Sequence, residues 1–192
     1  MLKDLVLKNR SYRRFYQDQP ITLETLRQLV ELARLAPSAR NMQPLKYVLC
    51  ADPATNAAIF PTLAWAGYLK DWPGPAEGER PTAYIVVLGD TALSHSFDVD
   101  EGLAIENIML GAVERGLGGC IIGSVQREEV RRILGIPLRY EILHVLALGK
   151  PKETVVLEAV GPDGDIKYWR DAQGVHHVPK RGLDELILME KG

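Results

Sequence analysis

Three arginines and a serine near the start of the chain have the chemistry of an anion site. Arg10, Ser11, Arg13 and Arg14 lie within the segment NRSYRRF. Guanidinium groups form paired hydrogen bonds with phosphate or carboxylate oxygens, and a hydroxyl group adds a further donor. The segment therefore predicts the binding of a phosphate or another oxyanion, with an ordinary solvated basic surface as the alternative.

A second polar segment lies between two prolines. In LAPSARNMQPLKYV, residues 35–48, Pro37 ends a helical pattern and Pro44 precedes a strand-like run. The polar side chains between the prolines are Ser38, Arg40, Asn41 and Gln43. Amide side chains can donate and accept hydrogen bonds at the same time. The loop is therefore either the edge of a binding site or only a connection between two elements.

A third basic segment lies near the other end of the chain. In VPKRGLDELI, residues 178–187, Lys180 and Arg181 stand beside the start of an apolar pattern. Two adjacent cations can contribute to an anion site, although such residues are most often part of an ordinary surface.

The glycine-rich segment GLGGCIIG, residues 116–123, does not predict a dinucleotide site. Its glycines follow a helical pattern and lead into a strand, whereas the Rossmann turn follows a strand and opens a helix. The segment instead predicts the end of a helix, with Gly116 or Gly118 in a left-handed conformation.

The histidines and cysteines predict no metal site. His144 lies inside an apolar strand pattern, where a hydrogen-bonded core position is expected. His176 and His177 are adjacent, so they point to opposite faces of a strand. Cys50 and Cys120 have neither CxxC nor metal-ligand spacing and are expected to be buried free thiols. We also find no nucleophile with an identifiable base partner.

The composition predicts one globular domain of 192 residues. Hydrophobic residues make up 46% of the chain and the net charge is −2, so there is no basic excess for nucleic acid or an anionic membrane. The apolar run at the N-terminus is too short for a signal peptide, and no segment is long enough to span a bilayer. A soluble cytoplasmic protein is expected.

Hydrophobic periodicity predicts alternating helices and strands, and hence an α/β or α+β sandwich with helices on both faces. The predicted helices cover 23–36, with Thr22 as the N-cap, 98–116 and 127–134. The predicted strands cover 46–50, 83–88, 119–122 and 141–149. The pattern at 98–116 is apolar around nearly its whole circumference, which is typical of a central core helix or of one buried in an oligomer interface. Two turn signals predict a β-hairpin appendage at 161–178.

Several motifs occur in an order that resembles the FMN-dependent nitroreductase family. RSYRRF (10–15) is similar to its R-S-x-R-x-F segment, and APSARNMQP (36–44) to its A-P-S-x-x-N-x-Q-P loop. DEGLAIENIMLGAVERGLGGCIIG (100–123) resembles its long helix and the G-L-G-x-C-x-x-G strand that follows. LGIP, LALGKP and PKRGLDEL then occur in the expected order, so the resemblance covers most of the chain.

The resemblance implies an α+β fold with FMN bound at the interface of a homodimer. The expected architecture is a nitroreductase-like three-layer α/β/α sandwich with a mixed, mainly antiparallel sheet, as a single domain over 1–192. The flavin contacts that it implies from one subunit are Arg10, Ser11 and Arg13. Those that it implies from the other subunit are Pro37, Ser38, Ala39 and Asn41, with Gln43 supporting the loop. It also implies that the backbone of Ile122 and Gly123 passes close to the flavin ring and that Lys180 or Arg181 completes the phosphate contacts.

The implied activity is transfer of hydride from NADH or NADPH to FMN and then to a nitroaromatic, a quinone or a similar planar acceptor, by a ping-pong mechanism. The flavin supplies this chemistry, so no protein side chain is expected to act as a catalytic nucleophile or base. The alternatives are a specialised flavin-fragmenting, dehalogenating or dehydrogenase member, or a non-catalytic flavin-binding protein.

The sequence departs from the family pattern in several places. Arg40 occupies a position that is usually small, and Leu45 stands where the family often has Trp. Lys180-Arg181-Gly182 replaces a more usual Arg-Lys-Pro order, which leaves open whether Lys180 or Arg181 contacts phosphate. Residues 63–81 are the least family-like and are where a substrate lid is expected. Its aromatic residues, which either stack on a substrate or only pack the loop, are Trp65, Tyr68 and Trp72.

Overall fold

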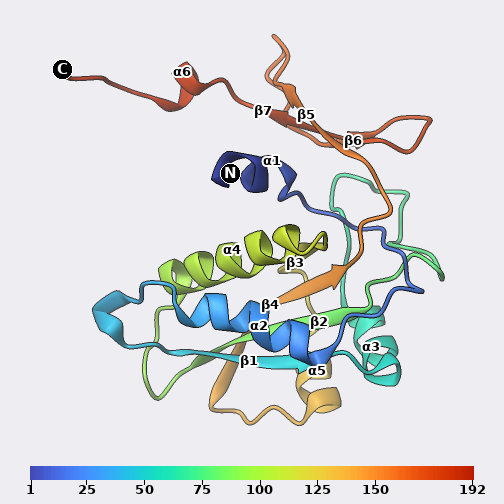
Figure 1. Ribbon diagram of the computed structural model, residues 1–192, viewed down its shortest axis with the longest axis vertical. Helices are drawn as coiled ribbons and strands as arrows, with labels where there is room; N and C mark the ends of the chain where they lie inside the picture. Colours follow the sequence, from blue (N-terminus) through green and yellow to red (C-terminus); the bar gives the residue numbers. More distant parts are fainter. The chain divides into compact units, whose positions relative to one another are not determined.

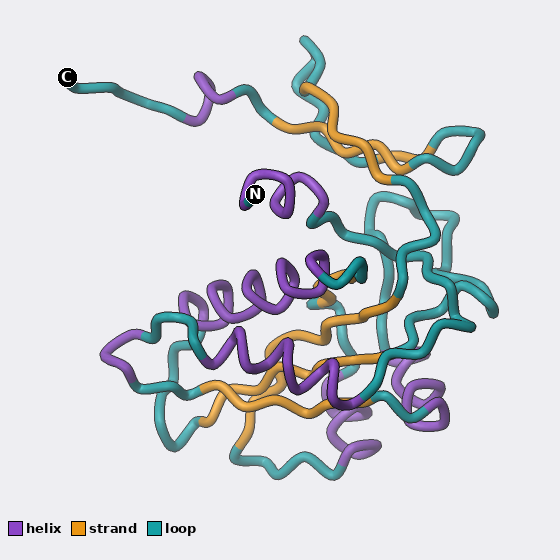
Figure 2. Tube along the Cα trace, viewed as in Figure 1, coloured by secondary structure: helices purple, strands orange, loops and turns teal.

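The computed structural model describes residues 1–192, which divide into two compact units. The first unit contains residues 1–65 and 73–152, and the second contains residues 66–72 and 153–192. Figure 1 shows the elements along the chain, and Figure 2 colours them by type. None of the helices has the length and apolar character that a membrane span requires.

A four-stranded antiparallel sheet forms the centre of the first unit. Its order is β1-β2-β4-β3, and every neighbouring pair is antiparallel. The strands are β1 (Leu45–Cys50), β2 (Ala83–Asp90), β3 (Gly118–Ile122) and β4 (Tyr140–Gly149). One parallel bridge, between Ser11 and Gly119, places the N-terminal segment beside β3. The predicted strands are thus present, each extended by up to two residues.

Helices cover both faces of this sheet (Figure 1). α2 (Leu23–Arg34) and α4 (Asp98–Glu114) lie on one face, whereas α3 (Pro53–Ile59) and α5 (Arg127–Leu134) lie on the other. α1 (Leu2–Lys8) contacts α4. Two short 3₁₀ turns, η1 (Ala39–Asn41) and η2 (Phe60–Thr62), complete this unit. The three-layer α+β sandwich is therefore confirmed.

Local capping explains where several helices begin and end. The backbone N–H of Thr25 donates to the side-chain oxygen of Thr22 at 3.1 Å, which confirms Thr22 as the N-cap of α2. Asp52 caps α3 in the same way, and Pro53 follows it at the first helical position. Gly116 has a φ of 67° just beyond the end of α4, as one of the two predicted alternatives requires.

α4 is buried on one side only, although its sequence is apolar almost all round. Ile108 and Ala112 are fully buried between α2 and the sheet. Val99 and Leu103 are 70% and 42% exposed within this chain. The first unit therefore carries an unpartnered apolar surface on its central helix, as an interface helix would.

The second unit is built around a small three-stranded sheet. It contains β5 (Val155–Ala159), β6 (Trp169–Arg170) and β7 (His176–Lys180) in the order β5-β7-β6, followed by α6 (Leu183–Leu186). β6 and β7 pair antiparallel, whereas β5 runs parallel to β7. The sequence did not predict β5. The single-domain organisation stays a prediction.

Candidate functional site

Residues 36–44 fold into a polar loop that is tied to the first turn of α4. The Ser38 hydroxyl donates to Asp100 Oδ2 at 2.5 Å, and the backbone N–H of Ala39 donates to Asp100 Oδ1 at 2.8 Å. The backbone N–H of Gln43 donates to the Ser38 oxygen at 2.9 Å, which closes the loop. Asp100 is only 6% exposed, so a buried carboxylate holds the loop in place.

Three non-glycine residues of this loop have a left-handed backbone. The φ angles are 53° for Arg40, 56° for Asn41 and 51° for Gln43. This region is costly for residues with a Cβ, by about 1–2 kcal/mol each. The Gln43 side chain also donates to the Asn41 carbonyl at 3.2 Å. Such a backbone persists only where its surroundings hold it, and the bonds to Asp100 supply that restraint.

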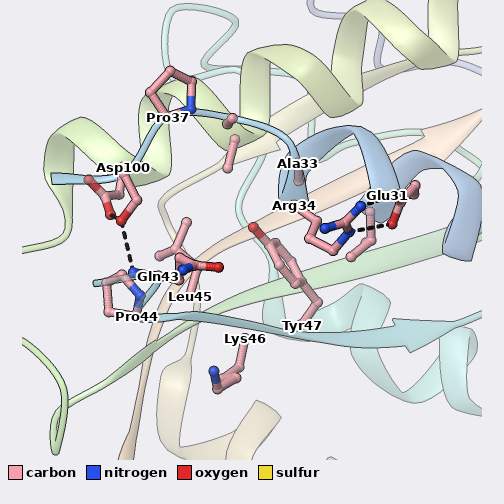
Figure 3. A pocket seen from close by; sticks show the side chains of 14 residues that line it. Glu31, Ala33, Arg34, Pro37, Gln43, Pro44, Leu45, Lys46, Tyr47 and Asp100 are labelled. Atoms are coloured by element: carbon pink, nitrogen blue, oxygen red, sulfur yellow. Dashed lines mark hydrogen bonds and ion pairs between the residues drawn. The ribbon is translucent and has the colours of Figure 1, made fainter. Parts of the chain in front are cut away.

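A cavity of about 300 Å³ lies beside the loop (Figure 3). Pro37 and Gln43 line it from the loop, Tyr47 from β1 and Asp100 from α4. Burial, together with the negative charges of Glu101 and Asp100, raises the pKa of Tyr47 to about 12. Tyr47 therefore presents a neutral hydroxyl group beside two carboxylates.

The basic segment NRSYRRF, residues 9–15, runs along the start of β3. Ser11 forms the parallel bridge with Gly119, and the backbone N–H of Tyr12 donates to the Gly119 carbonyl at 2.9 Å. The Asn9 side chain donates to both carboxylate oxygens of Glu106 on α4, at 3.1 Å each. The segment is thus fixed to both β3 and α4.

The arginines of this segment have different surroundings. Arg10 donates to the Val6 carbonyl at 2.8 Å, but its Nε is buried without a hydrogen-bond partner and no carboxylate pairs with it. Arg13 is only 8% exposed. Arg14 instead forms a two-point ion pair with Glu79, and the same contact lowers the pKa of Glu79 to about 2. Arg10 therefore keeps an uncompensated positive charge, whereas the charge of Arg14 is compensated by Glu79.

The far end of β3 carries the other two predicted contacts in this unit. Ile122 is buried as the last residue of the strand, and Gly123 follows it at an exposed position. A Cβ added to Gly123 would lie 3.2 Å from His144 Nε2, so a side chain at this position would crowd the imidazole ring.

His144 is not the core residue that the sequence predicted. Its Nδ1 lies 2.7 Å from Glu101 Oε1, but the imidazole side chain is 36% exposed. Sequence reasoning missed three residues at this end of the sheet, namely Asp100, Glu101 and His144. The available signal was the pair of adjacent acidic residues in the first turn of a mostly apolar helix, because buried carboxylates normally have partners.

The structure groups most of the predicted site residues in the first unit. The loop at 36–44 contacts the first turn of α4 through Asp100. His144 of β4, which lies beside Gly123 after the end of β3, contacts the same turn through Glu101. Lys180 and Arg181 belong to the second unit, where Lys180 ends β7 and Arg181 forms an ion pair with Glu185.

The aromatic residues of the expected lid pack against other groups of the chain. Trp65 packs against Phe60 in the first unit, with ring centroids 5.8 Å apart. In the second unit, Tyr68 lies 4.9 Å from the Tyr168 ring, and the Arg170 guanidinium lies over Trp72. These contacts favour the packing alternative over substrate stacking.

Comparison with known proteins extends this picture. The family model named Nitroreductase family matches residues 6–150. An Archaeoglobus fulgidus relative named for NADH dehydrogenase and NAD(P)H nitroreductase activity is 32% identical, over 73% of this chain and 80% of its own length. The structure of a nitroreductase family protein from Streptococcus pneumoniae has a TM-score of 0.68 at 21% identity, covering 85% of this chain and 96% of that one. An FMN-dependent nitroreductase from Clostridium difficile gives 0.64 at 22% identity, with 77% and 86% covered. The chain belongs to the nitroreductase family.

Proposed function

We propose that this protein is an FMN-dependent oxidoreductase that takes hydride from NADH or NADPH and reduces a nitroaromatic, a quinone or a similar planar acceptor. The observation that carries the proposal is that Arg10 has no carboxylate partner. Arg10 directly precedes Ser11, which pairs with Gly119 near the start of β3. Family membership supports it, as do the names of relatives that specify FMN and nicotinamide nucleotides.

The N-terminal segment fits the phosphate end of FMN. A phosphate carries up to two negative charges and needs several donors, which Arg10, Ser11 and Arg13 would supply. The buried, unpartnered Nε of Arg10 is the polar atom that an oxyanion would satisfy. Lys180 or Arg181 would complete the phosphate contacts.

The other predicted residues suit the flavin ring. The backbone of Ile122 and Gly123 would pass beside the ring, since Gly123 carries no side chain that would block it. The loop at 36–44 would approach from the partner subunit, with its shape fixed by Asp100. Its proposed contacts are Pro37, Ser38, Ala39 and Asn41, with Gln43 in support. When bound, FMN supplies the hydride chemistry, and the chain orients the reactants and excludes water.

The exposed apolar side of α4 supports a homodimer. Val99 and Leu103 of α4, and Leu2 and Leu7 of α1, are all more than two-fifths exposed within a single chain. Apolar surface of this kind is stabilised when a second copy covers it, and most soluble homo-oligomers are symmetric dimers. Two copies would also allow the loop of one subunit to meet the phosphate segment of the other.

One shared site for the nicotinamide and the acceptor implies ping-pong kinetics. The oxidised nicotinamide must leave before the acceptor can enter, so double-reciprocal plots at several acceptor concentrations should be parallel. Converging lines would show that both substrates bind together.

A paired substitution tests the proposed phosphate site. We expect Arg10→Ala combined with Arg13→Ala to abolish FMN retention, whereas Arg27→Ala combined with Arg132→Ala, on exposed helix faces, should retain it.

The purified unaltered protein should be yellow and should bleach when NADH is added under nitrogen. Yellow colour that persists would indicate a flavin-binding protein without turnover, and a colourless protein that ignores added FMN would contradict the proposal.

A further inference from the structure

One histidine lies at the end of β3 that the proposal places beside the flavin ring. Val145 of β4 is the register partner of Ile122, the last residue of β3, so His144 stands next to Gly123. A Cβ on Gly123 would lie 3.2 Å from His144 Nε2 and 3.4 Å from Cδ2. The Nε2 edge of the imidazole ring therefore lies against the α-carbon of Gly123.

Glu101 holds the opposite edge of this ring. The distance from His144 Nδ1 to Glu101 Oε1 is 2.7 Å, and the Glu101 side chain is only 9% exposed. A carboxylate that accepts from Nδ1 fixes both the ring orientation and the position of that proton. Nε2 has no hydrogen-bond partner within the chain, and the imidazole is 36% exposed, so Nε2 is the nitrogen free to exchange a proton.

Two other ionisable groups lie near this pair. Asp100 precedes Glu101 on α4, but its two oxygens accept hydrogen bonds from the loop at Ser38 and Ala39. Tyr47 approaches from β1, and its raised pKa keeps it neutral. Glu101 is therefore the carboxylate that contacts the imidazole of His144.

The acceptor reaction needs an acid of this kind. Reduction of a quinone to a hydroquinone, or of a nitro group to a nitroso group with loss of water, takes two electrons and two protons. A hydride brings both electrons and one proton, so the second proton must come from elsewhere. A positioned side chain that supplies such a proton typically contributes 10²–10⁴-fold in rate.

We propose that His144, oriented by Glu101, donates the second proton to the acceptor. The Nε2–H bond breaks and an O–H bond forms on the acceptor oxygen. The imidazole becomes neutral and keeps the proton on Nδ1, which stays hydrogen-bonded to Glu101. Solvent then returns a proton to Nε2 through the exposed side of the ring. This assignment rests on the proposed function, because it requires the acceptor to react beside Gly123.

The position of His144 can be tested without turnover. The four histidines can be labelled with ¹⁵N, and His144→Gln identifies which resonance belongs to His144. Adding FMN to the flavin-free protein should shift the His144 Nε2 resonance and leave that of His95, in an exposed loop, unchanged. If the protein turns yellow and the His144 resonance does not move, this proposal is overturned and the proposed function stands. If the protein binds no FMN, both are overturned.

The role of His144 can be tested with two acceptors. Ferricyanide takes single electrons and no proton, whereas a benzoquinone needs the proton that His144 would give. His144→Gln should lower the ratio of quinone to ferricyanide rates by about 10²-fold, and His95→Gln should leave this ratio unchanged. Equal slowing with both acceptors would show a structural role and overturn the proposal.

Discussion

Asp100 receives hydrogen bonds from both the hydroxyl group of Ser38 and the backbone of Ala39. These contacts join the first turn of α4 to a loop that is 62 residues away in the sequence. Because the loop contains three left-handed residues, its shape depends on this carboxylate more than on local preference.

Asp100→Asn should weaken both the loop and flavin binding. An amide cannot accept strongly at both positions, so we expect the free energy of unfolding to fall by about 2 kcal/mol. FMN affinity should fall about tenfold, as quenching of FMN fluorescence would measure. The control is Asp98→Asn, at an exposed position on the same helix turn. Equal FMN affinity in the two variants would show that the loop keeps its shape without Asp100.

Substitutions at Arg40 should separate backbone strain from side-chain chemistry. Arg40 has a φ of 53°, which glycine adopts readily and a β-branched residue adopts poorly. Arg40→Val should therefore lower the free energy of unfolding by about 1–2 kcal/mol, and Arg40→Gly should not. Urea unfolding measures both. If the Arg40→Val variant proves as stable as the Arg40→Gly variant, residue 40 does not adopt the left-handed conformation in solution.

The ion pair between Arg14 and Glu79 should make the first unit sensitive to acid. Hydrogen bonds from Arg14, followed by those from Lys152, lower the pKa of Glu79 from 4.5 to about 2. Because the pKa of Glu79 is lower in the folded state than in the unfolded state, its ionised carboxylate stabilises the folded state above about pH 4.5. This stabilisation is lost as the pH falls towards 2. Glu79→Gln should cost about 2 kcal/mol at pH 7 and flatten this acid dependence. The exposed Glu141→Gln variant serves as the control, and identical acid unfolding curves would contradict the assignment.

His177 should give the second unit the opposite pH dependence. Glu158 and Asp171 both contact its ring, which stacks on Trp169 with centroids 4.0 Å apart. The bond to Glu158, and then that to Asp171, raises the pKa of His177 above 6.5. Its contribution to stability is therefore complete below about pH 6.5 and is lost as the pH rises through the folded-state pKa.

Unfolding measured at a series of pH values checks the His177 prediction. His177→Gln should remove the loss of stability on the alkaline side, and His95→Gln should leave it in place. A loss that persists in the His177 variant would assign this pH dependence to another group.

Strands and long helices could be predicted because their signals are local. Most of β2, residues 83–88, is a continuous apolar run, and α2 has a Thr22 cap followed by helical spacing. α1 was missed because it is short and buries no residue. β5 was missed because its pairing with β7 is not local and its side chains are mostly half-exposed. A local pattern carries no information about such a partner.

The candidate site shows the same division. Residue types and the family motifs pointed to the basic segment and the polar loop, which are each continuous in sequence. The contact between Glu101 and His144 joins residues 43 apart, and only the folded sheet and helix bring them together. The low cost of burying Glu101 depends on that pairing, so neither residue alone signals it.

The second unit is assembled from two separate segments of the chain. Residues 66–72 leave the first unit and contact Tyr168 and Arg170, which are synthesised much later. During translation, the first unit has all its residues once Lys152 has emerged, whereas Tyr68 and Trp72 still lack their partners. A ribosome-bound chain that ends near Lys152 should therefore hold a folded sheet with a protease-sensitive bulge between Trp65 and Pro73. A simple C-terminal truncation is therefore an unsuitable way to remove the second unit, because Tyr68 and Trp72 would stay in the remaining protein without their partners.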